Sequence, residues 1–282
     1  MPMTPQELIQ NLGDLPPLPQ VATRVIRLSA NADTSSDDLQ AIIGTDQALS
    51  AQLLKVANSA MFGRVREVTT LTQAILTLGF SAARSVVLAA SVKNLFSRGP
   101  AGVQERLLWE HALVTGLTGS SFCQAVDHPA AEEAFLAGLM HDIGKCVLSL
   151  KFPEGYSALL RRIQGEETEG LRLELDAFGF DHAMVGEALL RAWNIGDSIQ
   201  SVVRWHHNPA QSPVEHQKIV ALVALGNQVA TDLQVGLDMP DALTRATHEA
   251  LDILRLDDKT YQEYRTAALE ALERDKGLIA EF

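Results

Sequence analysis

Apolar residues recur at helical spacing along almost the whole chain, and this pattern limits the fold more than any other feature. Val21, Val25 and Leu28, for example, follow one another at intervals of four and three residues. Stretches that alternate with period two are scarce and β-branched runs are short, so strands are not predicted. The sequence therefore predicts an all-α protein in which helices pack on helices.

The strongest break in this pattern is residues 97–102, which contain two glycines and one proline. It predicts a helical N-terminal subdomain over 1–100, packed on a helical bundle over 101–282 that ends in cover helices. Helices are expected over 46–58, 69–78 and 81–96 before the break, and over 104–125, 130–139, 144–151, 154–165, 167–178, 181–193, 197–206, 216–231, 240–254 and 258–281 after it.

Composition limits the compartment and the partners. The net charge of −12 argues against a broad contact with nucleic acid, which needs clustered Lys and Arg. No segment resembles a signal peptide, and the most apolar stretch, 85–92, is far shorter than the ~20 residues of a spanning helix. Cys123 and Cys146 form no CxxC pair, which favours a reducing compartment. We expect a cytoplasmic protein that contacts neither membrane nor nucleic acid.

Five of the eight histidines form a series in the second part of the chain, and an aspartate follows one of them directly. These candidate metal ligands are His111, His141, Asp142, His182, His206 and His207. Imidazole and carboxylate together suit iron, manganese, nickel or zinc, and a carboxylate between two ions can bridge them. Adjacent His141 and Asp142 can face one point only if the helix is interrupted there, which Gly144 permits.

Each of these residues also has an ordinary structural interpretation. An isolated buried histidine is usually a hydrogen-bonded core group, and the His206–His207 pair suits a surface as well as a metal site. Lys145 fits a phosphate contact or a solvated helix start. Asp181 fits a group that orients His182 or a helix cap. Cys146 fits an extra ligand or, more simply, a small core residue.

Other functional patterns have weaker support. Core packing explains Trp109, Trp193 and Trp205 better than ligand stacking does. Asn58 and Ser59 are interpreted as a structural pair that fastens a helix end. Residues 138–145 have one residue too many for a P-loop, and 116–119 suit close helix packing. No Gly-x-Ser-x-Gly elbow is present, and no nucleotide cofactor is expected.

The second half resembles the HD superfamily, whose motif runs His, His-Asp, His, His or His-His, then Asp. The matching segments are Trp109-Glu110-His111, His141-Asp142 with Gly144-Lys145, Asp181-His182-Ala183-Met184-Val185-Gly186 and Trp205-His206-His207-Asn208-Pro209. The resemblance implies a bundle of helices around one or two metal ions and hydrolysis of phosphate esters. If the site is catalytic, Asp142 and Lys145 are the candidate catalytic residues.

The first half resembles the HDOD subgroup of that superfamily. The matching segments are Leu15-Pro16-Pro17-Leu18-Pro19, Asp46-Gln47-Ala48-Leu49, Ala57-Asn58-Ser59-Ala60 and Ala74-Ile75-Leu76-Thr77-Leu78-Gly79. Together the motifs cover about residues 13–230. The resemblance implies a bacterial regulator with a signalling output, mostly without demonstrated catalysis.

Two departures separate this sequence from an active HD enzyme. The position of the terminal aspartate holds Asn227, whose neutral amide is a weaker ligand than a carboxylate. The Gly-Tyr-Pro of cyclic-di-nucleotide hydrolases is missing after His207. We therefore expect a signalling module with a degenerate metal site that acts on protein partners. The alternative is a metal-dependent phosphohydrolase for a small nucleotide or phosphomonoester; the sequence leaves the partner, the metal and the oligomeric state open.

Overall fold

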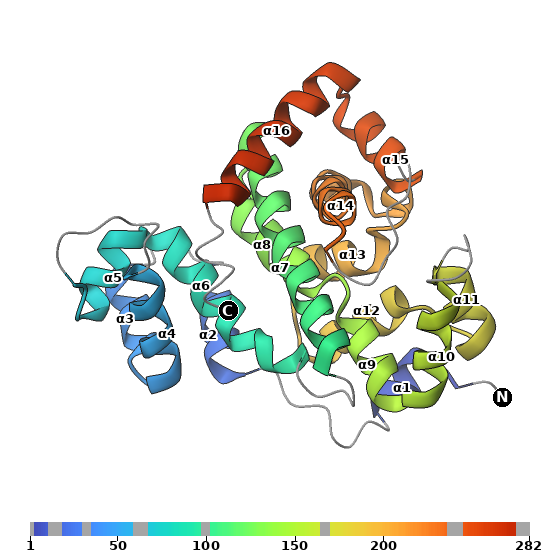
Figure 1. Cartoon of the computed structure of the whole chain (residues 1–282), viewed down its shortest axis with the longest axis horizontal. Helices are drawn as coiled ribbons and strands as arrows, with labels where there is room; N and C mark the ends of the chain where they lie inside the picture. Colours follow the sequence, from blue (N-terminus) through green and yellow to red (C-terminus); the bar gives the residue numbers. More distant parts are fainter. Residues whose placement is uncertain are drawn as a thin grey trace. The chain divides into compact units, whose positions relative to one another are not determined.

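The computed structural model describes residues 3–10, 19–29, 35–58, 67–96, 102–163, 170–235 and 245–274. Within these residues the regular elements are all helices, which confirms the predicted all-α fold (Figure 1). The chain forms two compact units. The larger contains Met1–Leu15 and Leu95–Leu269, and the smaller contains Pro16–Asn94 and Glu270–Phe282.

This division differs from the expected one at both ends of the chain. Helix α1 (Pro5–Gln10) belongs to the larger unit, where it contacts α12 (His182–Ala192) and Leu8 is fully buried. Residues 270–282 belong to the smaller unit. Most of the Gly-Pro break at 97–102 lies outside the described residues.

Local capping signals set the helix ends of the smaller unit. Its helices are α2 (Gln20–Ser29), α3 (Ser36–Ile43), α4 (Gln47–Ala57), α5 (Leu71–Leu78) and α6 (Phe80–Phe96). Ser35 and Asp38 form a reciprocal capping box at the start of α3. Gly79, at φ 81°, ends α5 in a conformation that glycine adopts without strain. Helix α6 begins directly after it at Phe80, one residue before the expected start.

Asn58 fastens the end of α4 to the segment before α5, as its structural interpretation predicted. Its Oδ1 accepts from the Val68 backbone nitrogen at 2.7 Å, and its Nδ2 donates to the Val68 carbonyl at 2.8 Å. Ser59 lies outside the described residues.

Substituting Asn58 with alanine is expected to destabilise the chain by about 2 kcal/mol, because both Val68 backbone groups lose their partner. Urea denaturation measures the loss. Asn58→Asp retains one acceptor and is expected to lie between wild type and alanine; equal stability of all three proteins would contradict this role of Asn58.

The larger unit is built around α7 (Gly102–Ala125), which packs along α8 (Ala131–Met140) and α14 (Gln217–Asp232). Glycines allow the close approach. A Cβ on Gly138 would lie 2.5 Å from the Gly116 Cα, and one on Gly226 would lie 2.6 Å from the Gly119 nitrogen. The interpretation of residues 116–119 as a close helix contact is therefore confirmed.

The remaining helices of this unit pack on this core or extend from it to one side (Figure 1). They are α9 (Ile143–Lys151), α10 (Pro153–Ile163), α11 (Gly170–Phe178), α12, α13 (Asp197–Trp205), α15 (Arg245–Leu254) and α16 (Asp258–Arg274), with short 3-10 turns at Pro209–Gln211 and Val214–His216. No single helix in the described part of the chain is long and apolar enough to cross a membrane. Leu71–Leu78 and Ala82–Ser91 reach that length and composition only as a pair, bent by 118°.

Candidate metal centre

The adjacent His141 and Asp142 occupy a break between two helices, as the sequence predicted. Helix α8 ends at Met140, His141 follows as its C-cap, and Asp142 precedes α9. A Cβ on Gly144 would overlap the backbone carbonyl oxygen of His182 and lie 2.9 Å from the Gly186 nitrogen. Only glycine therefore lets the start of α9 lie against α12, which brings Asp142 to His182.

Three further histidines reach the same place from other helices. His182 is the first residue of α12, His206 directly follows α13, and His111 lies within α7. All three residues are at most 2% exposed. His207 is half-buried, and its Nε2 lies 3.2 Å from the His182 Nε2.

Asp142 is the centre of this cluster, and its side chain is 1% exposed. The His182 Nε2 lies 3.2 Å from its Oδ1, and the His206 Nε2 lies 3.7 Å from the same oxygen. The His141 Nε2 lies 3.3 Å from its Oδ2, and the His111 Nε2 lies 3.8 Å away. Two sets of ligand atoms therefore share one carboxylate: Asp142 with His182, His206 and His207, and Asp142 with His111 and His141.

The outer nitrogens of the rings are held by the protein, which leaves the inner nitrogens facing Asp142. The His141 Nδ1 donates to the Gly138 carbonyl at 2.7 Å, and the His206 Nδ1 donates to the Val203 carbonyl at 2.9 Å. The buried Nε2 atoms of His141 and His206 have no hydrogen-bond partner. Buried polar nitrogens without partners are costly, and an inward Nε2 with an anchored Nδ1–H is the usual state of a metal-bound histidine. The residues present therefore fit a transition-metal ion.

Charge within the cluster is balanced around the aspartate. Burial opposes ionisation of Asp142, but His141 and Lys145 hold the pKa of its carboxyl well below the usual range. The Lys145 Nζ lies 2.9 Å from the Asp142 Oδ2, and Lys145 is 6% exposed. Lys145 is therefore a buried partner of Asp142, and the interpretation as a solvated lysine is wrong.

The sequence did not reveal the group that orients His182. The fully buried Glu174 of α11 accepts from the His182 Nδ1 and from its backbone nitrogen, both at 2.7 Å, and from the Tyr156 hydroxyl at 3.3 Å. Burial lowers the pKa of His182, but Glu174 and Asp142 outweigh it and raise that pKa to about 10. Asp181 caps α12 by accepting from the Met184 nitrogen at 2.7 Å, so the cap interpretation holds.

Replacing Glu174 with glutamine is expected to lower metal affinity by about 10- to 100-fold, because the carboxylate fixes the ring of His182 and raises its basicity. Competition with a chromogenic chelator measures the change. Glu187→Gln, at a half-buried glutamate paired with Arg191, is the matched control. Equal affinities for all three proteins would show that Glu174 does not position His182.

Asn227, which the resemblance to the HD motif places at the position of the terminal aspartate, contacts His111. The His111 Nδ1 lies 2.7 Å from the Val235 carbonyl, and its Nε2 lies 2.8 Å from the Asn227 Oδ1. The ring thus carries both protons, or the amide is rotated and donates to the Nε2 lone pair. In either arrangement the His111 Nε2 is engaged by Asn227.

Other predicted candidates lie outside the cluster. Trp109 is a buried core residue, as expected, and Trp205 carries the Arg204 guanidinium over its ring at 4.3 Å. Trp193 is half-buried at the end of α12. Cys146 is half-buried and belongs to neither set of ligand atoms.

Solved structures with the same fold come from several bacteria. An HDOD domain protein of unknown function from Geobacter sulfurreducens has a TM-score of 0.76 at 21% identity, covering 94% of this chain and 97% of that one. A protein with an inferred role in signal transduction from Marinobacter aquaeolei VT8 has a TM-score of 0.80 at 23% identity, covering 100% and 62%. An inferred metal-dependent phosphohydrolase from Shewanella amazonensis SB2B has a TM-score of 0.58 at 19% identity, covering 94% and 95%.

Comparison of the sequence with known proteins identifies the family of the chain. An uncharacterized protein of Treponema pallidum (strain Nichols) is 27% identical over 223 residues, which is 78% of this chain and 43% of that protein. The chain thus spans less than half of this curated relative. The HDOD domain profile matches residues 15–209, more than half of the sequence. With the cluster of histidines around Asp142 in the matching fold, the chain belongs to the HDOD domain family.

Proposed function

We propose that this protein is a non-catalytic signalling module that holds one divalent transition-metal ion as a structural element. Asp142, His182, His206 and His207 would hold the ion. The observation that carries the proposal is the contact between Asn227 and His111. It engages a ligand of the second set and replaces a carboxylate with a neutral amide. A site of this kind supports the architecture of the bundle and lacks the paired ions of a hydrolase.

The output of such a module is contact with another signalling protein. The inferred role of the Marinobacter structure in signal transduction and the fold shared with it support this proposal. The net charge of −12 favours protein partners over nucleic acid. We propose that the protein acts in the bacterial cytoplasm.

A second candidate function rests on the shared carboxylate. Asp142 belongs to both sets of ligand atoms, and Lys145 places a buried cation beside it. Paired metal ions would supply Lewis-acid activation of a phosphate ester and of water. In that case Lys145 would exchange its ion pair with Asp142 for the substrate phosphate. The inferred phosphohydrolase of Shewanella amazonensis supports this alternative.

Asn227→Asp separates the two functions. We expect the substitution to raise metal content from one to two ions per chain, because it adds a charged ligand beside His111 and His141. Metal analysis and hydrolysis of the phosphomonoester p-nitrophenyl phosphate with added Mn²⁺ are the two readouts. The wild type is expected to be inactive. Two ions and Asp142-dependent hydrolysis in the wild type would establish the phosphohydrolase instead.

A further inference from the structure

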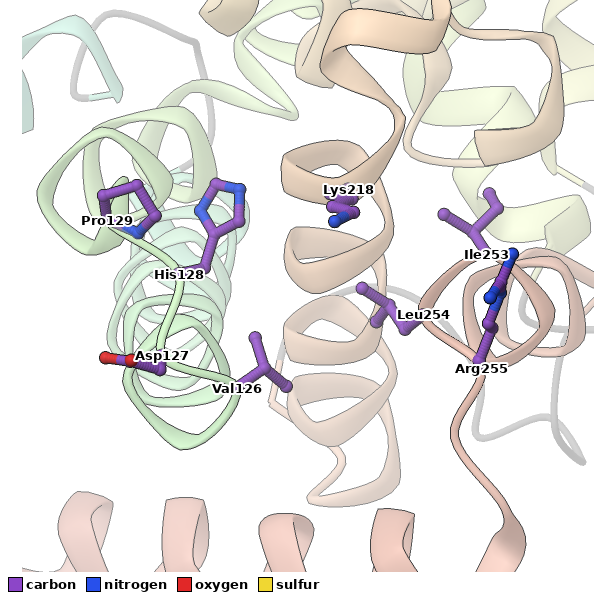
Figure 2. A pocket seen from close by; sticks show the side chains of 8 residues that line it. All are labelled: Val126, Asp127, His128, Pro129, Lys218, Ile253, Leu254 and Arg255. Carbon is purple, nitrogen blue, oxygen red and sulfur yellow. The ribbon is translucent and has the colours of Figure 1, made fainter.

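A pocket of about 730 Å³ lies in the larger unit, away from the histidine cluster (Figure 2). Residues 126–129 after α7, Lys218 at the start of α14, and residues 253–255 at the end of α15 line it. The volume falls within the range of about 300–1,000 Å³ that is typical of small-molecule sites. At 1.5 Å per residue, Lys218 lies about 13 Å along α14 from Asn227, and the end of α7 lies about 21 Å from His111.

The lining of the pocket carries more positive than negative charge, although the chain as a whole is negatively charged. Lys218 and Arg255 contribute two cationic groups to the pocket of a protein with a net charge of −12, and His128 lies beside them. Burial and then Lys218 lower the pKa of His128, so these two groups lie close enough to interact. Among the residues lining the pocket the single carboxylate is Asp127, and its oxygens point away from Lys218 in Figure 2. Such a wall favours an anion.

Apolar side chains complete the pocket between the basic groups. Val126 and Pro129 lie on one side, and Ile253 and Leu254 lie on the other, with Lys218 between them (Figure 2). This arrangement suits an anionic group attached to an apolar body, because each part meets a matching surface.

Arg255 reaches the pocket from a backbone conformation that is unfavourable for a residue other than glycine. Its φ of 55° is left-handed, a conformation that glycine adopts freely and that costs other residues roughly 1–2 kcal/mol. The turn after α15 is closed by the Leu256 nitrogen donating to the Leu251 carbonyl at 3.0 Å. Asp127 on the opposite wall is also left-handed, at 54°. The same left-handed turn follows other helices at Asn194 and Gln234, so it fixes the position of Arg255 at the pocket and does not by itself indicate a ligand.

We propose that this pocket binds a phosphorylated small molecule. The phosphate would lie between Lys218 and Arg255, and the apolar body would lie against Val126, Ile253 and Leu254. Basic residues near the ends of α7 and α15 also complement the helix dipoles, but that role needs no ligand and no apolar wall. A binding measurement therefore distinguishes a ligand-binding role of these residues from a structural role at the helix ends.

Isothermal titration calorimetry of the full chain, pretreated with a chelator, tests the site with phenyl phosphate and inorganic phosphate as probes. We expect saturable binding, tighter for phenyl phosphate because its ring meets the apolar wall. Lys218→Ala combined with Arg255→Gly is expected to weaken binding of phenyl phosphate at least about tenfold. Arg255→Gly relieves the left-handed strain, so loss of binding cannot be assigned to unfolding.

Two controls locate the binding. Lys259→Ala and Lys151→Ala each remove an exposed lysine that lies outside the pocket and outside the histidine cluster; both are expected to bind phenyl phosphate like the wild type. No saturable binding up to about 10 mM, equal binding by the pocket variant, or loss of binding in Lys259→Ala or Lys151→Ala would overturn the proposal. None of these outcomes depends on whether the cluster holds metal.

Discussion

Replacing Gly144 with alanine is expected to destabilise the protein by more than about 3 kcal/mol and to abolish metal binding. The added methyl group would overlap the His182 carbonyl, and backbone atoms of α12 cannot turn aside as a flexible side chain can. Helix α9 must then move away from α12, and Asp142 moves with it. Urea denaturation and metal analysis of the same preparation measure the two effects.

Gly155→Ala provides the matched control for this substitution. Gly155 is exposed within α10, and its Cβ would lie 3.4 Å from the Phe178 ring, an ordinary contact. Alanine there is expected to leave metal content unchanged and to stabilise the helix by about 0.5–1 kcal/mol. If Gly144→Ala kept both the stability and the metal of the wild type, the close approach of α9 to α12 would not be what forms the cluster.

Removal of the metal is expected to lower the thermal stability of the wild type markedly. The metal-free cluster leaves the buried Nε2 atom of His206, one of the proposed ligands, without a hydrogen bond. A ligand present at about a thousand times its Kd stabilises the folded state by about 4 kcal/mol, and a chelator removes that contribution. Thermal unfolding followed by circular dichroism, with and without chelator, measures the shift.

Two variants define the source of this shift. Asp142→Ala is expected to unfold at the same temperature with and without chelator, because it lacks the central ligand. His248→Ala removes an exposed histidine of α15 and should respond to chelator like the wild type. A wild type whose unfolding is insensitive to chelator would contradict a stabilising ion in the cluster.

Local signals in the sequence were sufficient for most of the helices and for the break at the centre of the site, but they did not predict α1. The Ser35 capping box, the glycine after α5 and the His141–Asp142 interruption each depend on residues close together in the chain. Such features can be recognised from spacing alone, because the capping side chain and the helix end lie within a few residues of each other.

Contacts between distant segments could not be predicted from the sequence in the same way. Glu174 belongs to a different helix from His182, and no spacing rule connects the two. Lys145 was expected in solvent or at a phosphate, because helix position does not reveal burial beside Asp142. The position of α1 against α12 follows from a tertiary contact that the composition of its six residues does not specify.

The contact that Asn227 makes could also not be predicted without the three-dimensional structure. The sequence identified it as a missing carboxylate, which predicts weaker metal binding. The structure adds that its amide contacts the His111 Nε2, 116 positions away along the chain. The substitution therefore removes one ligand and engages a second, which a comparison of motifs does not show.

Whether the cluster holds one ion through Asp142 and its three histidine partners is best decided by elemental analysis. The protein is purified without affinity-tag metal and compared with Asp142→Ala and His111→Ala. We expect about one equivalent of iron, manganese, nickel or zinc in the wild type. It should be absent from Asp142→Ala and retained in His111→Ala, since Asn227 engages His111. Two equivalents in the wild type with one lost in His111→Ala, or metal that Asp142→Ala retains, would contradict a single ion held in this way.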